Sequence, residues 1–275
     1  MNIHNQLTNN LEELGLNRIK EQLDTYLDLV ADGKKTMLEA LYELSEMEMK
    51  FRIEQAVTGC VKVANFPYLK EIQDFDFGYQ PSIDKTKIMD LMTLRFINNN
   101  ENIIFCGTPG VGKTNLSVSI GIAAAKQRYS VYFITFQDLI NQLKKAAAEN
   151  RLETRVKWFC RYKLLIIDEL GYQRMDVDSA NLFFNLISKR YEKSSTIITT
   201  NSPFSKWADI FQEPVLTNAL LDRLLHHCSV ININGPSYRL KDQMQHLTEE
   251  RSVKIQNKNV GFSTLFFCIK PTFLY

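Results

Sequence analysis

Residues 107–114 read GTPGVGKT, a glycine-rich stretch that ends in Lys-Thr. It matches G-x-x-x-x-G-K-[ST], a glycine-rich loop whose backbone N–H groups surround nucleotide phosphates. An apolar run at 103–106 precedes it and a helix-like segment over 115–128 follows it, which is the strand–loop–helix setting that the motif requires. An incidental glycine-rich turn is the alternative, and the match at all four fixed positions disfavours it. The stretch therefore predicts a nucleoside triphosphate site.

Each residue type in this loop has a physical task. Glycines permit positive φ angles and a close approach of the backbone, and the N–H groups at the following helix start point at the phosphates. Lys113 is expected to reach the β- and γ-phosphates, and the Thr114 hydroxyl to bind Mg²⁺. The predicted nucleotide-binding residues of the segment are Gly107, Thr108, Pro109, Gly110, Val111, Gly112, Lys113, Thr114 and Asn115.

Composition and charge narrow the class of protein. A length of 275 residues suits about two domains, or one large α/β domain with an appendage, and 45% hydrophobic residues can supply a core. The formal net charge is only +2, so a nucleic-acid contact must come from local basic patches. The five cysteines lack a C-x-x-C pair, which indicates reduced thiols. No apolar run approaches the roughly 18 residues of a membrane span, and the polar start is not a signal peptide, so we expect a cytoplasmic protein without a membrane partner.

The chain divides into four predicted segments. Residues 1–65 show helical periodicity and form a predicted N-terminal helical domain. Residues 66–85, with two prolines and five aromatic residues, form a predicted linker laid across the surface of the next domain. Residues 86–250 form the predicted phosphate-loop domain. Residues 251–275 are an atypical tail to which we assign no function.

Local patterns add detail to these segments. Thr36 and Glu39 have the spacing of a capping box at the start of a helix, and residues 85–96 fit one amphipathic helix. Three aromatic residues of the linker could stack on an adenine base or could anchor the linker to the core: Phe75, Phe77 and Tyr79.

Strand-like and helix-like segments alternate through the phosphate-loop domain. Helix-like segments separate the apolar runs, and the third run is continuous, as expected for a strand buried on both faces. This order predicts an α/β fold with a parallel sheet covered by helices on both faces. The predicted strands are 103–106, 131–134, 164–167, 196–200 and 230–233.

Two carboxylates, Asp168 and Glu169, directly follow the third predicted strand. The carboxyl ends of parallel strands share one edge of the sheet, so these residues are expected beside the phosphate loop. Asp168 is predicted to bind Mg²⁺, and Glu169 to orient and deprotonate the attacking water. The presence of Glu169 favours hydrolysis over phosphoryl transfer to a small acceptor.

Three more polar residues are candidates for the same site. Asn201 ends the fourth predicted strand and could hydrogen-bond the lytic water or the γ-phosphate, although a helix cap or turn is an equal alternative. Arg223 lies on an otherwise apolar helix, where it could act as an arginine finger on the next subunit or pair with a neighbouring acid such as Asp222. Arg239 is a further candidate for sensing the nucleotide.

The chain resembles a known family, the IstB-type transposition helper ATPases of the AAA+ class, which are similar to the DnaC helicase loaders. The resemblance runs from about residue 11 to residue 242. SPFSKW is its most specific element, because no phosphate chemistry requires it. The motifs that carry the resemblance are DFDFGYQPSID (74–84), IIDELGY (166–172), TTNSPFSKW (199–207), LLDRLL (220–225) and GPSYRLK (235–241).

The resemblance implies a particular function. It implies an AAA+ core without a helical lid domain, ATP and Mg²⁺ as ligands, and ATP-dependent assembly of a homo-oligomer on double-stranded DNA. It also implies a partner transposase encoded by the same mobile element. It assigns Lys113 and Thr114 to the phosphate loop, and Asp168 with Glu169 to metal and water. The remaining assignments are Asn201 to the first sensor, Arg223 to the finger acting in trans and Arg239 to a second sensor.

A DNA-binding surface is predicted from charge. Basic residues cluster between the second and third strands, where the loader relatives place helices that face DNA. A solvated helix face is an equally good interpretation of such a cluster. The candidate DNA-binding residues are Lys144, Lys145 and Arg151, with Arg155 and Lys157 nearby.

Two other functions compete with a DNA-binding ATPase that assists transposition. A helicase loader would use ATP as a switch and hold a hexameric helicase through residues 1–65. A small-molecule kinase would use the same phosphate loop, but Glu169, Arg223 and the lack of an acceptor-binding lid argue against it. The linker and SPFSKW favour the transposition helper.

Overall fold

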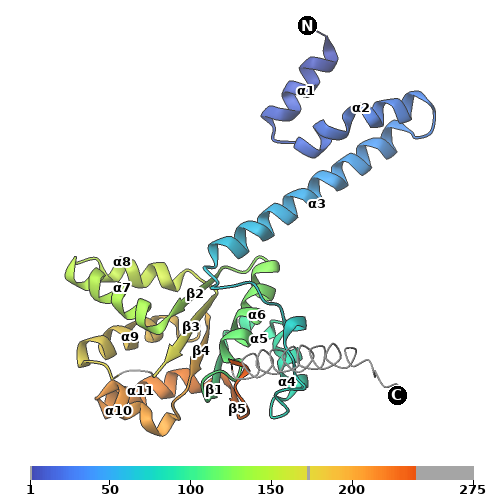
Figure 1. Cartoon of the computed structure of the whole chain (residues 1–275). Coiled ribbons are helices and arrows are strands. Elements are labelled where there is room, and N and C mark those ends of the chain that lie inside the picture. The colour runs from blue at the N-terminus through green and yellow to red at the C-terminus, as the bar shows by residue number, and fades with distance from the viewer. Residues whose placement is uncertain (1, 172–173, 240–275) are drawn as a thin grey trace, which may run out of the picture.

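The N-terminal part of the molecule is a helical arm (Figure 1). The computed structural model describes residues 2–171 and 174–239, and the tail at 251–275 lies outside them. Thr36 and Glu39 form the predicted capping box, each side chain accepting the backbone N–H of the other. The last helix of the arm is long and connects the first two to the rest of the chain. The helices are α1 (Ile3–Glu13), α2 (Asn17–Ala31) and α3 (Met37–Val63).

The arm is attached to the edge of the central sheet. Directly after α3, the carbonyl of Ala64 accepts the backbone N–H of Phe133 at 2.8 Å. The Asn65 amide donates to the carbonyl of Phe133 at 3.1 Å. Because Phe133 belongs to the edge strand β2 (Val131–Thr135), these two bonds satisfy backbone groups that an edge strand leaves open.

Five parallel strands form one sheet in the order β2–β3–β4–β1–β5, which confirms the predicted α/β class. This order places β1 beside β4 and β4 beside β3. The carboxyl ends of these three strands are therefore neighbours at one edge, where ligands bind in open parallel sheets. The strands are β1 (Asn102–Gly107), β2 (Val131–Thr135), β3 (Leu164–Leu170), β4 (Ser195–Thr200) and β5 (Cys228–Ile233).

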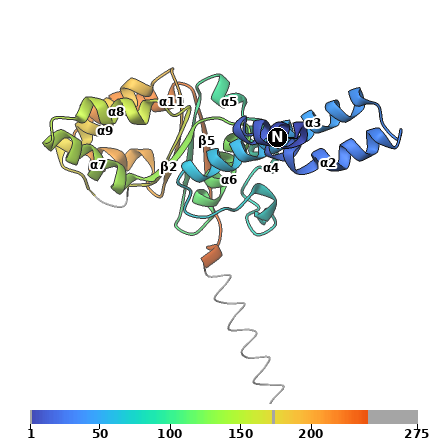
Figure 2. The same cartoon turned by 90° about the horizontal axis from the view of Figure 1, so that it is seen from above.

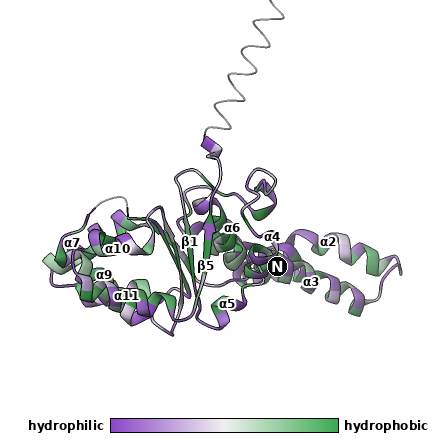
Figure 3. Cartoon of the chain, turned by 90° about the horizontal axis from the view of Figure 1, so that it is seen from below, coloured by the Kyte–Doolittle hydropathy of each residue, from purple (hydrophilic) through white to green (hydrophobic). Residues whose placement is uncertain are grey.

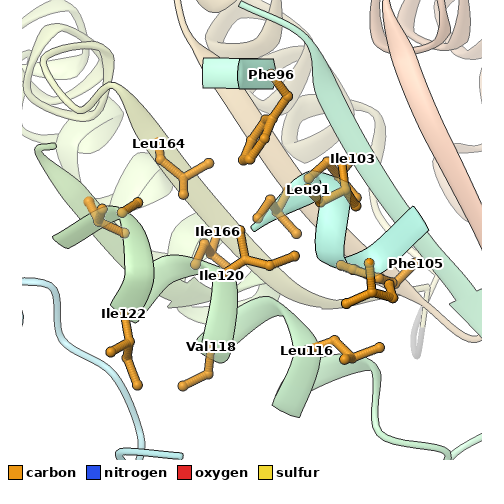
Figure 4. Packing of buried hydrophobic residues seen from close by; sticks show 14 of the residues in the cluster. Leu91, Phe96, Ile103, Phe105, Leu116, Val118, Ile120, Ile122, Leu164 and Ile166 are labelled. Atoms are coloured by element: carbon orange, nitrogen blue, oxygen red, sulfur yellow. The ribbon is translucent and has the colours of Figure 1, made fainter. Parts of the chain in front are cut away.

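Two hydrophobic cores lie on opposite faces of the sheet. Ile103 and Phe105 of β1 point into one core, and Ile104 and Cys106 point into the other, as the period of two in a strand dictates. In the first core, side chains of the helix after the phosphate loop pack against the strands (Figure 4). Figure 3 shows that hydrophobic residues predominate along the sheet, whereas the surrounding helices also carry polar residues.

Helices cover both faces of the sheet, as predicted (Figure 2). One face carries α4 (Lys85–Leu91), α5 (Arg95–Asn98) and α6 (Lys113–Lys126). The other face carries α7 (Phe136–Ala148), α8 (Leu152–Cys160), α9 (Val177–Arg190), α10 (Trp207–Phe211) and α11 (Pro214–Leu225). None of the helices in the described part of the chain is long and apolar enough to cross a membrane.

The predictions missed three local features. The amphipathic segment 85–96 is not one helix, because Leu94 takes a left-handed conformation (φ 64°) that ends α4 and starts α5. The helix α8 was not predicted, since its residues were interpreted only as a basic cluster. The motif SPFSKW forms η2 (Phe204–Lys206) and the start of α10, where the fully buried Trp207 donates its indole N–H to the carbonyl of Ser202 at 3.3 Å.

Candidate functional site

The phosphate loop connects β1 to the N-terminus of α6, where sequence analysis placed it. Gly110 and Gly112 have φ angles of 82° and 98°, which side chains rarely adopt. A Cβ atom at Gly110 would lie 2.0 Å from Ser237 Oγ, and one at Gly112 would lie 2.7 Å from the Phe75 ring. The glycines are therefore required both by backbone conformation and by the close approach of two other segments.

A cavity of about 630 Å³ opens beside the loop. Its volume lies in the range typical of small-molecule sites. It brings together the loop, the ends of β3 and β4, the linker and the segment after β5. Its lining residues are Tyr68, Lys70, Asp74, Phe75, Asp76, Pro109, Gly110, Gly112, Lys113, Thr114, Asn115, Glu169, Thr199, Thr200, Asn201, Tyr238 and Arg239.

The Lys113 ammonium is held inside the loop. Its Nζ donates to the carbonyl oxygens of Gly107 and Thr108, both at 2.8 Å. Burial lowers the pKa of Lys113, and the nearby Asp168 carboxylate opposes this effect. The side chain is thus a buried cation whose present partners are neutral carbonyls, and an anion in the cavity is a stronger partner for it.

Asp168 and Thr114 form the second part of the site. The Thr114 hydroxyl donates to the Asp168 carboxylate, 3.0 Å from Oδ1 and 3.1 Å from Oδ2. Burial raises the pKa of Asp168, while hydrogen bonds from Thr199 and Thr114 oppose the rise. A carboxylate and a hydroxyl in contact are the hard oxygen donors that Mg²⁺ prefers, so these two residues fit the predicted metal.

Glu169 and Asn201 lie on the wall of the same cavity. Glu169 is exposed, and its carboxylate has no hydrogen bond or ion pair with any side chain that the structure describes. Asn201 is partly exposed and accepts a hydrogen bond from the Ser202 hydroxyl at 3.2 Å. Glu169 reaches the cavity from the end of β3, and Asn201 reaches it from the position directly after β4.

The two candidate arginines lie in different places. Arg239 lines the cavity, although it follows β5 rather than the phosphate loop. Arg223 does not line it. The Arg223 guanidinium donates to the carbonyl of Ala219 at 2.9 Å and lies 4.7 Å from the centre of the Phe184 ring, and within residues 2–171 and 174–239 it forms no ion pair with Asp222.

Aromatic residues border the cavity, but only one of the three predicted from the linker does so. Phe75 lines it, whereas Phe77 and Tyr79 pack behind, against Phe75 and Tyr238 respectively. Sequence reasoning missed Tyr68 and Tyr238. The backbone N–H of Tyr238 donates to the carbonyl of Gly110 at 2.9 Å, so the segment after β5 is hydrogen-bonded to the phosphate loop.

The candidate DNA-binding residues are on the surface of α7 and at the start of α8. Lys144 pairs with Asp176 at 2.6 Å, and Arg151 pairs with Glu149. Lys145 is exposed. Exposed pairs of this kind contribute little to stability, so a polyanion can compete for these cations.

A second cluster of metal-ligating side chains lies outside the cavity. Glu192 Oε1 is 3.7 Å from His226 Nδ1 and 3.9 Å from His227 Nε2, and all three residues are exposed. The histidines are not spaced in the sequence as metal ligands usually are. Glu192 comes close to His226 and His227 only when the chain is folded. The Tyr191 hydroxyl already hydrogen-bonds His226 Nδ1 at 2.7 Å.

Comparison with protein families gives one match that spans most of the chain. Residues 9–246 match the family described as IstB-like ATP binding protein. An ATP-binding protein of insertion sequence IS232 from Bacillus thuringiensis subsp. berliner is 49% identical over 249 residues, which are 90% of this chain and 98% of that protein. An ATP-binding protein of insertion sequence IS21 from Pseudomonas aeruginosa is 38% identical over 233 residues, 85% of this chain and 88% of that protein.

Comparison with solved structures identifies the fold. The crystal structure of DnaI matches with a TM-score of 0.51 and 20% identity, covering 59% of this chain and 90% of that one. A DNA replication initiation factor matches with a TM-score of 0.52 and 16% identity, covering 65% of this chain and 54% of that one. At these identities the likeness is one of fold, that of the P-loop AAA+ domains.

Proposed function

The chain belongs to the IstB-like ATP-binding proteins, and from that premise we propose that it is a DNA-binding ATPase that assists a transposase. In this proposal it binds and hydrolyses ATP, assembles as a homo-oligomer on double-stranded DNA, and acts in the cytoplasm with the transposase of the same element. Residues 86–250 are the proposed ATPase domain, joined by the linker 66–85 to the helical arm 1–65.

The observation that carries the proposal is the contact between Thr114 and Asp168 beside Lys113. The Thr114 hydroxyl and the buried Lys113 ammonium line one cavity, and the hydroxyl contacts the buried Asp168 carboxylate behind it, a set that suits a triphosphate with its metal. Thr114 and Asp168 would hold Mg²⁺, which when bound neutralises charge on the phosphate oxygens. Lys113 would turn from the loop carbonyls to the phosphates.

The remaining residues have proposed roles around the γ-phosphate. Glu169 accepts the proton of the attacking water, since it lines the cavity and its carboxylate is bonded to no side chain in the described part of the chain. Asn201 hydrogen-bonds that water or the γ-phosphate, and Arg239 senses the nucleotide. Arg223 does not line the cavity of its own subunit, which supports a role as a finger on the neighbouring subunit.

The proposed function is tested by measuring phosphate release at increasing protein concentration, with and without duplex DNA. Turnover is expected to rise with both, because a site completed by Arg223 of a second subunit is active only in an assembly. Turnover that responds to neither contradicts the proposal. Stimulation by a hexameric helicase instead of DNA would favour the helicase loader.

The proposed DNA surface makes a separate prediction. The double variant Lys144→Glu, Lys145→Glu is expected to lose salt-sensitive DNA binding and to keep ATP binding, because both side chains are exposed on α7 and neither lines the nucleotide cavity. Fluorescence anisotropy with labelled duplex DNA at several salt concentrations measures the loss.

Two control variants make that measurement specific. The variant Lys85→Glu, Lys87→Glu changes the net charge equally in α4, on the other face of the sheet. The single variant Lys145→Glu leaves the Lys144–Asp176 ion pair intact. It therefore distinguishes the effect of the changed charge from the effect of breaking that ion pair. Unchanged DNA affinity in the α7 double variant would remove these residues from the proposed surface.

A further inference from the structure

One hydroxyl contacts both acidic residues at the end of β3. Thr199 lies on the neighbouring strand β4, and its hydroxyl donates to Asp168 Oδ1 at 2.5 Å. The same oxygen accepts the backbone N–H of Glu169 at 2.9 Å. Because Thr199 is only 1% exposed, water cannot readily replace either bond.

The backbone around Glu169 explains why this bond is needed. Ile167 pairs with Ile198 and Leu170 pairs with Thr200, so the register of β3 against β4 shifts between these two pairs. Within the shift, Glu169 takes a φ angle of 66°, a conformation that residues other than glycine rarely adopt. The Thr199 hydroxyl supplies the acceptor that a regular strand ladder would otherwise give to the Glu169 N–H.

Thr199 also differs from Thr114, the other hydroxyl that contacts Asp168. Under the proposed function, the Thr114 oxygen is a metal ligand, and its hydrogen bond to Asp168 must weaken when it turns to the metal. The Asp168 side chain then keeps one hydrogen bond from the described residues, that from Thr199. A side chain that hydrogen-bonds a metal ligand in this way fixes the orientation of that ligand.

We propose that Thr199 is a positioning residue for ATP hydrolysis, one that orients the Asp168 carboxylate toward the metal and holds the Glu169 backbone so that its side chain faces the nucleotide. This inference rests on the proposed ATPase function. Thr199 begins the motif TTNSPFSKW (199–207), in which only Asn201 had a proposed role at the nucleotide.

The test compares Thr199→Val, which keeps the shape and removes the hydroxyl, with Thr199→Ser, which keeps the hydroxyl. For the valine variant we expect a fall in kcat of about 10- to 100-fold and a higher Mg²⁺ requirement, with little change in the KM for ATP. Hydrogen exchange of the Glu169 amide, measured without nucleotide or metal, is expected to speed up. The serine variant should restore all three properties.

A matched control removes a buried hydroxyl elsewhere. Thr217 on α11 is 2% exposed, and among the described residues its hydroxyl bonds only the carbonyl of Glu213. Thr217→Val should therefore leave kcat, the Mg²⁺ requirement and Glu169 exchange unchanged. Thr199→Ala, which removes the hydroxyl without placing a methyl group beside Asp168, carries the same expectation as Thr199→Val if the latter fails to fold.

The outcomes separate this inference from the proposed function. If the unaltered protein hydrolyses ATP and the folded valine variant matches it in kcat, Mg²⁺ requirement and Glu169 exchange, Thr199 has no positioning role. A serine variant as impaired as the valine variant also overturns the inference, because packing would then explain the loss. If the unaltered protein hydrolyses no ATP, the proposed function fails. The inference about Thr199 is then tested by hydrogen exchange alone: an unchanged exchange rate of the Glu169 amide in the valine variant refutes the role of the Thr199 hydroxyl in holding that amide.

Discussion

Lys113→Ala is expected to abolish ATP turnover and ATP-dependent assembly on DNA together. The ammonium is the buried cation of the loop, and its Nζ lies 2.8 Å from two carbonyl oxygens. Removing one preorganised charged donor from such a site costs about 10²–10³ in rate. It also removes the main attraction for the phosphates, so the variant should bind a fluorescent ATP analogue poorly. Phosphate release and electron microscopy with duplex DNA measure the two losses.

Lys126→Ala is the matched control for this experiment. Lys126 is at the other end of the same helix, α6, and pairs with Glu71 at 2.5 Å on the surface. Its loss should leave turnover and assembly intact. If the Lys113 variant still forms full assemblies that depend on ATP, occupancy of the loop and assembly are not linked.

Glu169→Gln is expected to separate ATP binding from ATP hydrolysis. The Glu169 carboxylate lines the cavity and has no bonded side-chain partner in the described chain, so glutamine can replace it without breaking a structural contact. A general base of this kind contributes about 10²–10⁴ in rate, and the amide cannot accept the proton. Turnover should fall by that factor, while ATP binding and assembly on DNA persist or become longer-lived.

The control for this variant is Glu153→Gln. Glu153 is an exposed carboxylate on α8 that pairs with Lys189, outside the nucleotide cavity, so its neutralisation should not change turnover. Two results would remove Glu169 from the proposed role: unchanged hydrolysis in the glutamine variant, or a loss of ATP binding as large as the loss of hydrolysis.

Much of the fold follows from patterns that are local in the sequence. Short runs of four or five residues rich in β-branched, aromatic and other apolar side chains predicted all five strands, and the run at 164–167 is continuous because its strand is buried on both faces. Where a single residue changes the backbone, the prediction failed. Nothing in the amphipathic pattern of 85–96 reveals the left-handed conformation of Leu94 that divides α4 from α5.

The loop GTPGVGKT and the acidic pair Asp168–Glu169 were recognisable in the sequence alone, because phosphate binding requires particular residues at short, fixed spacings. The residues that surround them come from distant parts of the chain. The order β2–β3–β4–β1–β5 brings Thr199 to Asp168 and Glu169, and the packing of the segment after β5 brings Tyr238 to Gly110. Such contacts join residues far apart in the chain, so they depend on which strands become neighbours, and no local spacing encodes that choice.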